Sequence, residues 1–96
     1  MFLLLSRYVK PVEAIDRVLP AHRQFLDRHY KSGLFIVSGP LNPRTGGVIL
    51  TTDVTREQID AVLAQDPFVT AGISEYEIVE FRATKRAEWF QPPSER

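Results

Sequence analysis

Apolar residues follow two different periods along the chain, and the switches between them outline the predicted elements. Runs of consecutive or alternating apolar residues are typical of strands and occur at 2–9, 34–40, 48–53 and 74–84. Residues 11–33 and 54–65 instead place their apolar residues at helical spacing. Gly33 is a stop signal for the first helix, and Thr55 with Gln58 has the spacing of a capping box at the start of the second. The predicted order is strand, helix, strand, strand, helix, strand.

This βαββαβ order predicts an α+β fold of the ferredoxin-like type, built on one antiparallel sheet. Right-handed crossovers place both helices on the same face of the sheet. Pro20 lies inside the first helical pattern and predicts a kink or a break there. The strands at 2–9 and 34–40 are apolar at consecutive positions, so the face without helices is also apolar. We therefore expect a homodimer in which two sheets pack face to face, as in a dimeric α/β barrel.

The length of 96 residues suits one domain, which we assign to residues 1–84, with a polar, proline-rich tail at 85–96. Trp89 and Phe90 are expected to anchor this tail to the body or to a partner subunit. Twelve basic and twelve acidic residues cancel, which argues against nucleic acid or an anionic membrane as a partner. The absence of cysteine excludes disulfides and fits a cytoplasmic location. The apolar run at the start lacks the basic region and cleavage site of a signal peptide.

His22 lies on the apolar side of the first predicted helix, between Leu19 and Leu26. One interpretation is a histidine at the edge of the core, hydrogen-bonded to a backbone carbonyl. The other is a general base, because free imidazole has a pKa of about 6.5 and suits proton transfer near neutral pH. A base of this kind needs a partner that orients it, and this partner is usually a carboxylate.

Asp66 can supply that carboxylate, because both predicted helices lie on one face of the sheet. The Asp-Pro pair is also typical of a helix N-cap followed by a first-turn proline, with Gly72 closing one short helical turn. The capping and catalytic interpretations are compatible, since one oxygen can cap while the other faces a cavity.

Binding residues are expected where the second predicted strand ends. Ser38, Gly39 and Pro40 form a turn that can line a cavity, and Arg44 in the following loop can hold an anionic group. His22 and His29 are about two helical turns apart, roughly 10 Å, which is too far to share one metal ion. We expect no metal and no cofactor; haem ligation by His22 is an alternative that nothing else in the sequence requires.

Three segments together resemble the YciI-like (YCII-related) family: "LPAHRQFLDRHYKSGLFIVSGP", "GGVIL" and "QDPFVTAGISEYEIVEF". The resemblance implies a dimeric α/β barrel with a histidine–aspartate pair in a cavity beside the sheet. The histidine of the Pro-Ala-His motif corresponds to His22, the aspartate of Asp-Pro-Phe to Asp66, and Ser38 falls in the Ser-Gly-Pro motif. Some members have arginine where this chain has Leu19. A related activity is dehydrochlorination of a chlorinated hydroxyquinol.

Two hypotheses follow. The first is a small acid–base enzyme without cofactor, of lyase or isomerase type, in which His22 and Asp66 act on a small cyclic or aromatic substrate. The second is a module without turnover that binds a small molecule or assists assembly, in which Asp66 is only a helix cap and His22 a packed polar residue.

Overall fold

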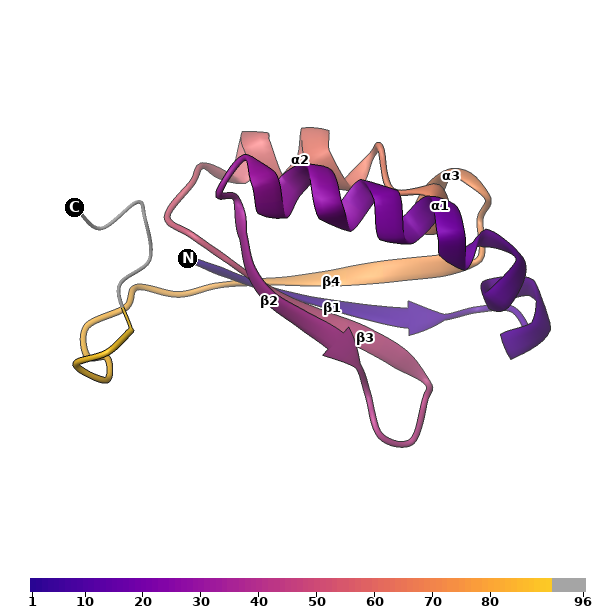
Figure 1. The fold of residues 1–96 in the computed structure, drawn as a ribbon, viewed down its shortest axis with the longest axis horizontal. Coiled ribbons are helices and arrows are strands. Elements are labelled where there is room, and N and C mark those ends of the chain that lie inside the picture. The colour runs from indigo at the N-terminus through magenta and orange to yellow at the C-terminus, as the bar shows by residue number, and fades with distance from the viewer. Residues whose placement is uncertain (91–96) are drawn as a thin grey trace.

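The computed structural model describes residues 1–90 and has two layers, an antiparallel sheet and a layer of helices on one of its faces (Figure 1). The spatial order of strands is β2–β3–β1–β4. In chain order the elements are β1 (Phe2–Tyr8), α1 (Val12–Lys31), β2 (Phe35–Pro40), β3 (Gly46–Thr51), α2 (Arg56–Leu63), α3 (Pro67–Thr70) and β4 (Ser74–Glu80). This arrangement confirms the predicted α+β, ferredoxin-like protomer.

Helix α1 continues through Pro20, so the prediction of a break there is wrong. A single helix spans Val12–Lys31, and in Figure 1 its first turns lie at an angle to the rest. Pro20 is exposed, so its ring meets solvent rather than the core. The helix ends where the sequence predicts, because Gly33 adopts the left-handed conformation with φ of 84°.

The face of the sheet toward the helices carries the core. Phe2 and Leu4 of β1 are fully buried and alternate with Leu3 and Leu5, which point to the opposite face. The main cluster joins this strand to the helices through Phe25, Phe35, Ile49, Ile59 and Leu63. A smaller cluster of Ile15, Phe68 and Ile73 joins the start of α1 to α3 and β4. The turn of α1 that carries His22 lies between these two clusters.

The opposite face of the sheet has no helix over it (Figure 1) and carries an apolar centre. The antiparallel register places Leu3 beside Leu50 and Val79, and Leu5 beside Val48. Toward the end of β1 the face becomes charged, with Glu77 beside Leu5 and an ion pair between Arg7 and Glu75. Val37, which pairs with Leu50, is 55% exposed. This open apolar face is the surface on which the predicted dimer depends.

Strand β3 begins two residues earlier than the sequence predicts, because Gly46 and Gly47 belong to the strand and not to the preceding loop. A Cβ atom at Gly46 would lie 1.8 Å from the backbone oxygen of Ser6. Only glycine lets the two backbones approach this closely. The close pairing brings the 41–45 loop, with Arg44, against the end of β1.

The last described residues form no helix or strand. Trp89 is 83% exposed and has an edge contact with Phe90, so it does not anchor the tail to the body of its own chain. The remainder of the predicted tail, residues 91–96, lies outside the described part of the chain.

Candidate functional site

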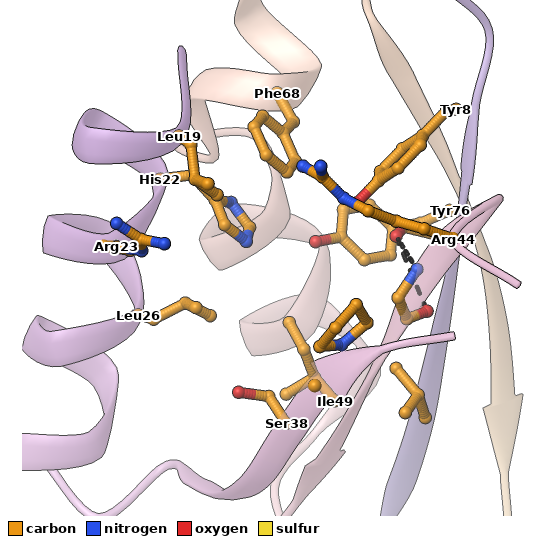
Figure 2. Close-up of a pocket in the computed structure, with 15 residues that line it drawn as sticks. Tyr8, Leu19, His22, Arg23, Leu26, Ser38, Arg44, Ile49, Phe68 and Tyr76 are labelled. Carbon is orange, nitrogen blue, oxygen red and sulfur yellow. Dashed lines mark hydrogen bonds between the residues drawn. The ribbon is translucent and has the colours of Figure 1, made fainter. Parts of the chain in front are cut away.

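A cavity of about 430 Å³ opens between α1 and the helix-facing side of the sheet, beside the β2–β3 loop (Figure 2). This volume suits a small molecule. The lining combines aromatic and aliphatic side chains with a few polar groups: Ser6, Tyr8, Leu19, His22, Arg23, Leu26, Ser38, Gly39, Pro40, Arg44, Gly47, Val48, Ile49, Phe68 and Tyr76. All of the predicted site residues except Asp66 are in this set.

Asp66 lies directly behind the cavity, where its carboxylate is fully buried. It precedes α3, and its Oδ1 accepts a hydrogen bond of 3.0 Å from the backbone N–H of Phe68, so the predicted N-cap is present. Oδ1 also lies 2.8 Å from Nδ1 of His22. Capping and pairing with the histidine thus occur together, at one oxygen.

The other carboxylate oxygen, Oδ2, accepts a hydrogen bond of 2.6 Å from the hydroxyl of Tyr76. Burial, reinforced by the negative charge of Asp66, raises the pKa of the Tyr76 hydroxyl, so this group stays protonated and donates. Three donors therefore satisfy a carboxylate that has no contact with solvent. A buried charge needs hydrogen-bond partners of this kind to offset the loss of contact with water.

The contact with Asp66 fixes which nitrogen of His22 carries a proton. An ionised carboxylate only accepts hydrogen bonds, so Nδ1 is the protonated nitrogen of the neutral ring. The lone pair of Nε2 is then left for a ligand in the cavity that His22 lines. The imidazole is 12% exposed and stacks on Phe68, with ring centroids 3.8 Å apart and planes 4° from parallel. The hydrogen bond to Asp66 thus fixes one edge of the imidazole ring, and the Phe68 ring covers one of its faces.

Tyr76 and Phe68 are site residues that the sequence analysis missed. The pairing of Tyr76 with Ser6 puts it on the helix-facing side of the sheet, beside the cavity. The alternation of Ser74, Tyr76 and Ile78 was a signal for that face, but it could not show that the hydroxyl reaches Asp66. Phe68 is buried, and in sequence it appears as an ordinary apolar residue of a capped turn.

The predicted binding residues Ser38, Gly39, Pro40 and Arg44 lie together on the sheet side of the cavity. The Ser38 hydroxyl forms a hydrogen bond with the hydroxyl of Tyr30 in α1. Arg44 donates a hydrogen bond of 2.6 Å to Asp16 and lies 5.9 Å above the ring of Tyr8. In Figure 2 its guanidinium reaches toward Phe68 from the β2–β3 side, whereas His22 and Arg23 extend from α1.

His29, the second histidine, has a different environment. Its ring contacts Phe25 and Phe35, and its Nε2 is buried with no hydrogen-bond partner in the described chain. Burial and the neighbouring charge of Arg28 lower its pKa, and a hydrogen bond with Gln65 opposes this shift. His29 is therefore a neutral packing residue.

Neither a metal cluster nor a membrane span occurs in residues 1–90. No group of three or more His, Cys, Asp or Glu side chains is placed there to hold a metal ion. No helix of this region is long and apolar enough to cross a bilayer.

Comparison with known proteins gives a matching family and similar solved structures. The family model of the YCII-related domain matches residues 1–82. Among solved structures, the fold is similar to 5-chloro-2-hydroxyhydroquinone dehydrochlorinase (TftG) from Burkholderia phenoliruptrix AC1100, determined in complex with 2,5-dihydroxybenzoquinone. The TM-score is 0.70 at 18% sequence identity, over 85% of this chain and 94% of that one. No curated protein sequence matches the chain.

Proposed function

Because the chain belongs to the YCII-related family, we propose that it is a small acid–base enzyme, of lyase or isomerase type, that uses His22 and Asp66 without a cofactor. The observation that carries the proposal is the hydrogen bond between His22 and a fully buried Asp66 at the wall of a cavity. The substrate is a small cyclic or aromatic molecule. The similarity in fold to a dehydrochlorinase supports this class of reaction.

In the proposed reaction, Nε2 of His22 takes a proton from an acidic C–H or O–H of the substrate. The electron pair of that bond stays on the substrate, and the imidazole becomes an imidazolium whose Nδ1–H points at Asp66. In an isomerisation the proton returns to another substrate atom. In an elimination the electron pair expels a leaving group such as chloride, and the proton is released to solvent. Neither course needs an oxidant or a reductant.

Ser38, Gly39, Pro40 and Arg44 are proposed to position the substrate opposite His22. They come from the end of β2 and the following loop, across the cavity from α1. The Ser38 hydroxyl can bond a substrate oxygen, and Arg44 can hold a negatively charged substituent.

The working form is proposed to be a cytoplasmic homodimer, with the open sheet faces packed together. Two such faces would each bury Leu3, Leu5, Val37, Leu50 and Val79, and burial of apolar area contributes about 25 cal/mol per Å². The cavity lies on the opposite side of the sheet and would stay open in this dimer.

The test is turnover by wild type, His22→Gln and Asp66→Asn on a panel of hydroxylated and chlorinated aromatic compounds. Chloride release and exchange of carbon-bound hydrogen with deuterated water are the readouts. Loss of general-base catalysis costs about 10²- to 10⁴-fold, so both variants should lose at least about 100-fold. His29→Gln on the same helix and Asp60→Asn on the surface are the matched controls. Equal turnover by wild type and both site variants would falsify the dyad.

The alternative, a binding module without turnover, makes a different prediction. The wild type would then bind members of the panel, observed as shifts of the His22 ring signals in NMR spectra, while releasing no chloride and exchanging no hydrogen. Binding unaffected by Asp66→Asn would support this alternative.

A further inference from the structure

The cavity lining contains basic side chains and no acidic one among the described residues. The chain is neutral, with twelve basic and twelve acidic residues. The cavity lining, taken over the described residues, contains Arg23, Arg44 and His22 but no aspartate or glutamate. Two carboxylates lie next to the lining. Asp66 is fully buried and already accepts three hydrogen bonds, and Asp16 is paired with Arg44. A ligand in the cavity therefore meets guanidinium N–H donors and no unpaired carboxylate.

The two arginines differ in how they are held. Arg44 is fixed by its hydrogen bond to Asp16 and by the Tyr8 ring beneath it, which leaves further N–H groups of its guanidinium for a ligand. Arg23 follows His22 directly in α1 and has no ion-pair partner or hydrogen bond within residues 1–90. Figure 2 shows its guanidinium on the α1 side of the cavity, with Arg44 coming from the sheet side. An unpaired cation at the mouth of a cavity is placed to attract a negative ligand.

An anionic substrate also suits proton removal by His22. The step leaves an extra electron pair on the substrate, and nearby guanidinium groups stabilise that charge as it develops. Tyr8, Phe68 and Tyr76 form an aromatic wall that suits a planar ring beside the charged group. Recognition of the anion and stabilisation of the transition state would thus use the same two side chains.

We infer that the cavity selects a small planar anion, a ring that carries a carboxylate or an ionised hydroxyl, and that Arg23 and Arg44 recognise its charge. This inference rests on the proposed function for the identity of the site. It adds the charge of the substrate and the role of Arg23.

The test compares two probes of the same shape, 4-hydroxybenzoate and 4-hydroxybenzamide, titrated into the full chain by calorimetry and by NMR of the His22 ring. A charge-assisted hydrogen bond is about twice as strong as a neutral one, so the benzoate should bind at least about 10-fold more tightly. Added sodium chloride should weaken binding of the benzoate and leave the benzamide unchanged. Arg23→Gln and Arg44→Gln should each reduce the preference at least about 5-fold. Arg56→Gln, an exposed arginine paired with Asp60 in α2, should keep it.

Four outcomes would each overturn the inference. The two probes could bind equally, the amide could bind more tightly, the benzoate could fail to bind at 20 mM (a chosen upper concentration), or the preference could survive Arg23→Gln. His22→Gln separates this result from the proposed function. If His22→Gln keeps the preference for the benzoate while wild type shows no turnover on any compound, the anion site stands and the enzyme proposal fails. If wild type turns over neutral compounds only, the enzyme stands and the anion site fails.

Discussion

Replacing Asp66 by alanine should destabilise the protein far more than the loss of an ordinary helix cap. The cap alone is worth about 1 kcal/mol. Here the same carboxylate also satisfies Nδ1 of His22 and the hydroxyl of Tyr76, which is only partly exposed. A donor that loses its partner in a buried position costs about 1–3 kcal/mol. The cap and the Tyr76 hydroxyl together give an expected loss of about 2–4 kcal/mol.

Asp66→Asn separates hydrogen bonding from charge. Its amide oxygen can still accept from His22 and Phe68, and its NH₂ group can donate to the Tyr76 hydroxyl oxygen. The Tyr76 O–H then loses its acceptor, but the other groups keep a partner, so we expect the asparagine variant to lose less stability than the alanine variant. In turnover both variants should fail alike, because neither can stabilise a His22 imidazolium by charge.

Urea unfolding at one fixed protein concentration measures both losses, and the fixed concentration removes any contribution from association. In a thermal scan, about 1 kcal/mol corresponds to roughly 4–8 °C for a domain of this size, so Asp66→Ala should melt more than about 10 °C below wild type. A loss of 1 kcal/mol or less for Asp66→Ala would refute the reasoning, since the carboxylate would then be only a cap.

Three further predictions concern other parts of the structure. Tyr76→Phe removes one hydrogen-bond donor from Asp66, so the carboxylate interacts more strongly with His22. The acid limb of the pH–activity profile should therefore move to higher pH. An unchanged profile would show that Tyr76 is only structural. His29 has a lowered pKa in the folded state, so the unfolded chain takes up the proton first and stability should fall as pH drops below about 6.5. Urea unfolding of His29→Leu should show a free energy of unfolding that depends less on pH between pH 7 and 5. An equal pH dependence in wild type and variant would contradict this account. Val37→Asp puts a charge on the open sheet face and should convert a dimer to a monomer in light scattering, whereas Glu57→Gln on α2 should not; a wild type that is already monomeric would contradict the proposed dimer.

Local signals predicted most of the elements correctly, because their causes lie within a few residues. The capping box of Thr55 and Gln58 is present, as is the cap of Asp66 on the turn after it. Gly33 ends α1 because the required left-handed backbone excludes most other residues. Pro20 was the exception, since a proline on the exposed side of a long, well-packed helix loses one hydrogen bond without ending it.

The buried side of α1 shows where periodicity was not enough. The sequence analysis placed Leu19 and Leu26 with His22 on the apolar side, and both are only partly buried. The fully buried residues of α1 are Ile15 and Phe25, and His29 packs beside Phe25. Shifting the predicted apolar stripe of a helix by one residue gives another stripe that fits the 3.6-residue period almost equally well. Only docking on the sheet selects the line that is buried, through contacts with Phe35 and its neighbours.

The sequence by itself determined the order of the elements, their caps and the candidate pair of His22 and Asp66, because these follow from short-range chemistry and from recognisable motifs. Only the tertiary structure decided that the two side chains meet, since they are 44 residues apart in sequence and their contact depends on how α1 and α3 pack together. The hydrogen bond from Tyr76 and the position of Arg44 at the cavity also come from strand register and loop placement. Such contacts depend on the position of one element relative to another, which no local pattern of residues specifies.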